Sequence, residues 1–122
     1  MAILNRYDSC RGLTLFKWGQ LRVEVWYCPA GYTIIEHSHP SEDVELMYVF
    51  GSTTFYRRDI RDDKVESVKC GIKYLFRKFS VRFFHSHWFS VGRLPLIFIN
   101  FQRFLPGNKP VSAAIDFKIA TK

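Results

Sequence analysis

Residues 31–51 read GYTIIEHSHPSEDVELMYVFG, with two histidines, a proline and four carboxylates placed between two glycines. In an extended backbone alternate side chains point to opposite faces, so His37 and His39 point to the same face. Pro40 cannot donate to a strand ladder, and we expect a turn through residues 41–43 before a returning strand over residues 44–50. Two imidazoles and a nearby carboxylate suit Zn, Fe, Mn, Ni or Cu.

A second histidine pair, His85 and His87, lies far along the chain, and all four histidines of the protein belong to these two pairs. Residues 81–91 alternate as one strand, with Val81, Phe83, His85, His87, Phe89 and Val91 on the same face. An unpaired imidazolium on such an apolar face is costly, and a metal is one partner that satisfies it. The pattern predicts a metal site formed by both pairs.

The length of 122 residues allows a single domain over residues 1–122. A hydrophobic content of 48% and an aromatic content of 17% predict a packed, strand-rich core and argue against disorder. The sequence shows neither an apolar run of membrane-spanning length nor a signal-peptide pattern, which predicts a cytoplasmic protein.

About nine short strands separated by Gly and Pro turns predict an all-β sandwich, jelly roll or small barrel. The run over residues 94–101 is nearly all apolar, as in a strand buried on both faces. We expect further strands over residues 12–18, 21–27, 53–58, 65–69 and 72–76, and a last strand or short helix over residues 113–120.

The cysteines and the net charge give weaker signals. Cys10, Cys28 and Cys70 form neither a disulfide framework nor a CxxC metal motif. The net charge of +7 permits nucleic-acid binding, but the basic residues are dispersed, and a solvated sheet face with guarded edges explains them better. Nucleic acid is therefore a less favoured partner.

The motif over residues 31–51 resembles the first signature of the cupin superfamily: a glycine, five residues, H-x-H, a loop, a glutamate, six residues and a glycine. Residues 71–100 resemble the second signature more loosely. The resemblance implies a double-stranded β-helix, the jelly-roll barrel of cupins, that holds one divalent metal. Carried over to this sequence, the metal ligands are His37, His39, Glu45 and His87.

The sequence departs from the cupin pattern in two places. Five residues separate His39 from Glu45 where the family has three or four, so Asp43 or Glu42 is an alternative oxygen ligand. The second motif lacks its usual proline and glycine, which leaves His85 as a competitor of His87. Whichever of the two does not bind the metal can act in acid–base catalysis, and His85 is the catalytic candidate.

The resemblance implies a protein that acts on or binds a small molecule, as a mononuclear-metal dioxygenase or an isomerase. Met47, Phe83, Phe89 and Phe98 would line an apolar pocket. The alternatives are a non-catalytic ligand-binding module or a jelly-roll protein associated with a virus or phage. We further expect a homodimer formed through an apolar sheet edge.

Overall fold

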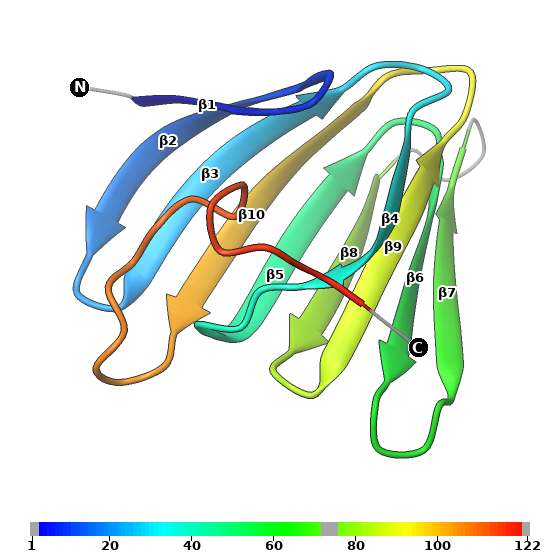
Figure 1. Ribbon diagram of the computed structural model, residues 1–122. Coiled ribbons are helices and arrows are strands. Elements are labelled where there is room, and N and C mark those ends of the chain that lie inside the picture. The colour runs from blue at the N-terminus through cyan, green and yellow to red at the C-terminus, as the bar shows by residue number, and fades with distance from the viewer. Residues whose placement is uncertain (1–2, 72–75, 121–122) are drawn as a thin grey trace.

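Two antiparallel sheets make up the part of the chain that the computed structural model describes, residues 3–71 and 76–120 (Figure 1). The larger sheet contains, in spatial order, β1 (Ile3–Tyr7), β2 (Cys10–Trp18), β3 (Leu21–Cys28), β10 (Leu96–Phe104), β5 (Glu42–Phe50) and β8 (Phe76–Arg82). The smaller sheet contains β11 (Lys118–Ile119), β4 (Thr33–Ser38), β9 (His85–Val91), β6 (Thr53–Asp59) and β7 (Val65–Cys70).

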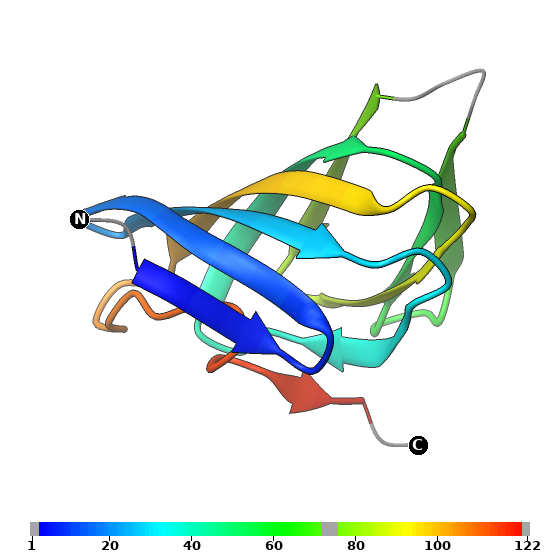
Figure 2. The same cartoon turned by 90° about the horizontal axis from the view of Figure 1, so that it is seen from above.

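From β3 to β10 the chain passes repeatedly between the sheets. β3, β5, β8 and β10 belong to the larger sheet, whereas β4, β6, β7 and β9 belong to the smaller one. This alternation wraps the two sheets around a common interior, as the view from above shows (Figure 2). The predicted all-β double-stranded β-helix is confirmed. The described residues include no helix long and apolar enough to cross a membrane.

Aromatic side chains from both sheets fill the interior. The Phe55 ring of β6 lies 4.8 Å from the Phe89 ring of β9 and 5.3 Å from the Phe79 ring of β8, measured between centroids. Met47 and Leu96 of the larger sheet are fully buried in the same cluster. Each such side chain contributes roughly 1.5–3 kcal/mol by leaving water, so the core fixes the strands that position the polar residues described below.

The strand predicted over residues 81–91 is instead two strands, β8 and β9, which belong to different sheets and are joined by a short turn. β8 ends at Arg82, a turn occupies residues 83–84, and β9 begins at His85. Phe83 consequently lies in the turn and is 60% exposed. Apolar and polar residues continue to alternate on both sides of this short turn, so the sequence pattern alone did not reveal the turn. The prediction that Phe83 lines an apolar pocket is therefore wrong.

β10 is buried on one face only, contrary to the prediction for residues 94–101. Leu96, Phe98 and Asn100 point to the interior, whereas Ile97 and Ile99 are 43% and 38% exposed on the outer face. On the neighbouring β3, the inward face carries the polar Arg22 and Glu24 as well as Trp26, all three of them buried. Alternation identified the faces of these strands but not which face is covered.

Two further differences concern the ends of the sheets. β1 pairs with β2 and was not predicted. The strand predicted over residues 72–76 lies, except for Phe76, outside the described residues. The C-terminal segment, residues 112–119, forms turns and the two-residue strand β11, which pairs with β4.

Candidate metal centre

The two histidine pairs meet where β4 and β9 lie side by side. His37 of β4 is the direct cross-strand partner of His87 of β9. The register shifts by one residue between Ile34 and His37, so β4 carries a bulge there. A bulge re-aims the side chains that follow it, and here both Ile34 and His37 are buried although they are three residues apart.

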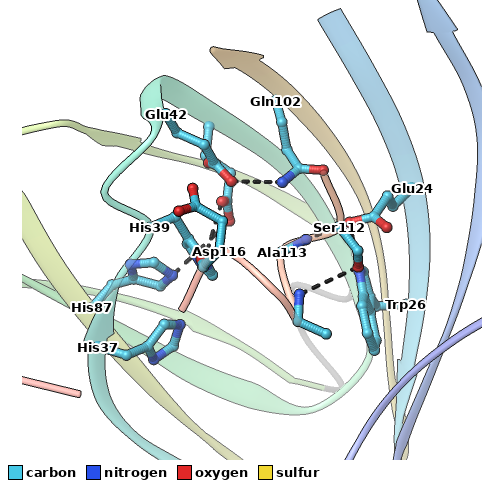
Figure 3. A network of polar contacts seen from close by, with 12 residues as sticks. Glu24, Trp26, His37, His39, Glu42, His87, Gln102, Ser112, Ala113 and Asp116 are labelled. Atoms are coloured by element: carbon cyan, nitrogen blue, oxygen red, sulfur yellow. Dashed lines mark hydrogen bonds and ion pairs between the residues drawn. The ribbon is translucent and has the colours of Figure 1, made fainter. Parts of the chain in front are cut away.

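His37, His39 and His87 gather into one cluster (Figure 3). Their ring centroids are 4.2 Å apart for His37–His87, 5.0 Å for His37–His39 and 5.2 Å for His39–His87. One ligand atom from each ring lies within 4.8 Å of the others. The structure thus brings three of the four histidines together: both members of the first pair and one member of the second.

Glu45 supplies the carboxylate that faces these rings. Its Oε2 lies 3.7 Å from Nε2 of His39, and its Oε1 lies 3.9 Å from Nε2 of His87. The pairing of β5 with β10 shifts by one residue at Asp43, which adds one residue to β5. This bulge explains why five residues separate His39 from Glu45, and why Glu42 also points inward.

The two alternative oxygen ligands, Asp43 and Glu42, have surroundings that differ from those of Glu45. The carboxylate of Asp43 is bound by Arg103 at 2.7 Å, on the exposed side of the strand. Glu42 is buried and accepts a hydrogen bond from Nε2 of Gln102 at 2.5 Å. Burial, and then the neighbouring Glu45, raise the pKa of Glu42 well above its usual value. Glu42 forms a second close group with His39 and Glu45, but its raised pKa disfavours the anionic form that a metal binds.

Backbone carbonyls orient two of the imidazoles. Nδ1 of His37 lies 2.8 Å from the carbonyl oxygen of Ile35, within the β4 bulge, and Nδ1 of His39 contacts the carbonyl oxygen of Asp116. A carbonyl oxygen can only accept, so both rings must carry their proton on Nδ1. Each therefore presents a lone pair on Nε2, the tautomer that a metal ligand requires.

Burial disfavours the cationic form of two of the three histidines, His37 and His87. It is the largest cause that lowers the pKa of His37 from the ordinary 6.5 to about 3, and the neighbouring His39 adds to the effect. Burial, followed by the charges of the other histidines, lowers the pKa of His87 well below its usual value. Neutral imidazoles are good metal ligands.

Replacing His37 by Gln is expected to change the pH dependence of stability. The folded-state pKa of His37 lies below the unfolded-state value, so its contribution is complete above about pH 6.5 and is lost as the pH falls towards 3. In protein treated with a chelator, we expect His37→Gln to gain about 1.4 kcal/mol relative to the unchanged protein between about pH 7.5 and about pH 5.5. Urea unfolding at both pH values measures this difference in stability. The titration of Glu42 affects both proteins equally and therefore cancels from the comparison. Parallel stability–pH curves would show that His37 titrates normally.

A pocket adjoins the cluster on its apolar side, with a cavity volume of about 50 Å³. Met47, Phe89 and Phe98 line it as predicted. Its other lining residues include Tyr7, Cys10, Trp26, Cys28, Asn100 and Phe117. A largely apolar cavity with a few polar groups is the usual form of a small-molecule site.

His85 stands apart from the three clustered histidines. It lines a second, more polar pocket on the other side of the cluster, together with His39, Glu45 and His87. Its Nδ1 accepts a hydrogen bond from the backbone N–H of Arg82 at 2.9 Å, so neutral His85 carries its proton on Nε2. Burial, and then Arg57, lower the pKa of His85. The structure thus places His87 in the cluster and His85 outside it, a distinction that the sequence left open.

The C-terminal segment closes the site, a role that no sequence pattern predicted. The Phe117 ring stacks on His37 with 4.5 Å between centroids. The Asp116 carboxylate accepts the backbone N–H of Ser41 at 3.0 Å, while its carbonyl holds His39. These contacts join residues more than seventy positions apart, and no local spacing pattern could predict them.

Comparison with known proteins identifies the fold. Neither a protein-family model nor a curated protein matches the sequence. Among solved structures, the capsular polysaccharide assembling protein CapF from Staphylococcus aureus superposes with a TM-score of 0.71 at 16% identity, over 98% of this chain and 34% of CapF. An uncharacterized double-stranded β-helix protein from Klebsiella pneumoniae subsp. pneumoniae gives 0.60 at 21% identity, over 89% of this chain and 82% of that one.

A recombinant oxalate oxidase in complex with glycolate gives a TM-score of 0.55 at 20% identity, over 72% of this chain and 44% of that one. The chain spans about a third of the length of the CapF chains. These identities are low, and what the similarity establishes is the fold. The chain therefore has the cupin fold, a double-stranded β-helix closed by two antiparallel sheets.

Proposed function

We propose that this chain is a metal-dependent cupin enzyme that acts on a small molecule, with one divalent metal held by His37, His39, Glu45 and His87. The observation that carries the proposal is the cluster of three imidazoles, two of which, His39 and His87, lie within 4 Å of the buried Glu45 carboxylate. Oε2 of Glu45 is buried and lacks a hydrogen-bond donor among the described residues. A cation at this position would satisfy it, and nitrogen and oxygen donors suit Fe, Mn, Ni, Zn or Cu.

The residues around the cluster support a dioxygenase-like reaction. When bound, the metal would supply Lewis-acid or redox chemistry. Met47, Phe89 and Phe98 keep water away from the ligand. Asn100 is buried in the same pocket, and its Oδ1 has no donor within the described residues, so it can accept a hydrogen bond from the polar end of a ligand. From the polar pocket His85 can donate the proton on Nε2.

Dioxygen consumption tests this reaction class. Protein loaded separately with Fe, Mn, Ni, Zn or Cu is offered a panel of small thiols, diketones and catechols. We expect substrate-dependent oxygen uptake with at least one redox-active metal and none with Zn. The matched control Glu45→Gln keeps the side-chain size and should abolish the uptake. Product formation without oxygen uptake would replace the dioxygenase by an isomerase, and ligand binding without turnover would leave a binding module.

We also propose that the chain forms a homodimer through the outer face of the larger sheet. Ile97 of β10 lies between Tyr27 of β3 and Phe50 of β5 in the strand register, and all three are more than 40% exposed. Contiguous exposed apolar patches of this kind mark association sites, and a patch on one face can cover its own copy about a two-fold axis. The proposed interface is a sheet face rather than the sheet edge expected from the sequence.

Placing a charge in the middle of this face should separate the dimer. We expect Ile97→Lys to be monomeric in light scattering at concentrations where the unchanged protein is dimeric, because burying the unpaired ammonium is costly. Ile119→Lys is the matched control, since Ile119 is 51% exposed on the short strand β11 of the other sheet. A monomeric unchanged protein, or equal effects of the two substitutions, would refute the interface.

A further inference from the structure

Two cysteines lie opposite each other in the wall of the larger sheet. β2 and β3 pair with Arg11 opposite Tyr27, which places Cys10 opposite Cys28 one residue further along. Their Sγ atoms are 2.7 Å apart, and both residues are buried, with 2% and 1% exposure. A covalent S–S bond is about 2.05 Å long, and directly opposed residues of antiparallel strands have the Cα separation that a disulfide needs. The two sulfur atoms can therefore form a disulfide bond without a movement of the backbone.

The pair belongs to the pocket beside the histidine cluster. Cys10 and Cys28 line the same cavity as His37, His39, Glu45 and His87. A bulky disulfide reagent is poorly suited to thiols that are so little exposed, whereas a molecule of the size of hydrogen peroxide fits a cavity of this volume. Cys70, the third cysteine, lies at the end of β7 in the smaller sheet and does not line this pocket.

The surroundings of the two thiols differ, which assigns them different roles. Hydrogen bonding with Cys28 is the largest cause that lowers the pKa of Cys10, and the hydroxyl of Tyr32 adds to it against the opposing effect of burial. The pKa of Cys28 is raised by its contact with Cys10 and by burial. The more acidic thiol is the better initial nucleophile, so Cys10 reacts first and Cys28 second.

We infer that Cys10 and Cys28 form a reversible dithiol–disulfide pair that is oxidised by a hydroperoxide entering the pocket. The Cys10 thiolate attacks one peroxide oxygen, the O–O bond breaks, and hydroxide leaves and takes up the proton released from the Cys10 thiol, giving water and a sulfenic acid. The Cys28 sulfur then attacks the Cys10 sulfur, the S–S bond forms, the S–O bond breaks, and water leaves with the Cys28 proton. Two thiols are oxidised and one hydrogen peroxide is reduced to two water molecules.

Mass spectrometry of the folded, full-length chain tests this inference. Reduced protein is treated with hydrogen peroxide, quenched with an alkylating reagent after unfolding, and digested. We expect a Cys10–Cys28 disulfide, an intact-mass loss of two hydrogen atoms, an alkylated Cys70, and full recovery of the thiols with a dithiol reductant. Because the bond joins β2 to β3, the oxidised protein should also unfold at a higher temperature.

Single substitutions assign the two roles. Cys70→Ala should oxidise like the unchanged protein, and Cys28→Ala should leave a Cys10 sulfenic acid that a dimedone probe captures. In Cys10→Ala, Cys28 should stay reduced. If a variant fails to fold, the peptide map of the unchanged chain still decides. The inference is overturned if the thiols of the folded protein survive peroxide, if Cys70 takes part in the bond, or if the disulfide forms only in denaturant.

Discussion

Replacing His37 and His87 together by Ala is expected to abolish stoichiometric metal binding. The two rings are cross-strand partners with 4.2 Å between centroids, and their loss leaves one imidazole and one carboxylate. Removing an outer partner of a ligand already costs about 10–100-fold in metal affinity, so each single substitution of a ligand should cost more than that. Metal content after dialysis, measured by elemental analysis, should fall from about one ion per chain to background.

Two matched variants make the result specific to the proposed ligands. His85→Ala removes a histidine that borders the cluster without belonging to it, and it should retain about one ion per chain. Glu45→Gln keeps the volume of the side chain, removes its charge, and should weaken binding strongly. Circular dichroism checks that each variant is folded. Full metal content in the double variant, or its loss in His85→Ala, would show that the ligand set is wrong.

Replacing Gly51 by Ala is expected to destabilise the fold severely, by about 3 kcal/mol or more. Gly51 has a φ of +130°, in a region that L residues rarely adopt. A Cβ added there would lie 2.3 Å from the carbonyl oxygen of Pro95 and 3.2 Å from Cα of Leu96. Both are backbone atoms at the start of β10, so the clash cannot be relieved by rotating a side chain. Urea unfolding measures the loss.

Gly31, the other glycine of the same motif, is the matched control. It has a φ of +80°, but an added Cβ would meet no atom within 4 Å. We expect Gly31→Ala to cost only the backbone strain, about 1 kcal/mol. Equal losses in the two variants would mean that β10 moves freely away from Gly51. The comparison separates two reasons for a glycine at a turn: a positive φ, and a lack of space for a Cβ atom.

Most strands could be predicted because their signals are local. Two-residue alternation and Gly or Pro turns located β3, β6 and β7 to within one residue at each end. The prediction failed where two different structures produce the same local pattern. Residues 81–91 alternate equally well as one strand and as the two strands β8 and β9, which a short turn joins and which lie in different sheets. The exposure of Ile97 and Ile99 depends on what lies above the sheet, which the pattern of β10 does not contain.

The sequence by itself determined the fold class and the candidate ligands, because strand periodicity and the histidine spacing are properties of a few neighbouring residues. Only the tertiary structure decided which of those side chains lie close together. The β4 bulge and the β4–β9 register place His37 opposite His87, and the β5 bulge turns Glu45 towards them. The pairing of Cys10 with Cys28 and the stacking of Phe117 on His37 join segments that are distant in the chain. Such contacts depend on strand register and on packing between strands and sheets, and the spacing of neighbouring residues carries no information about either.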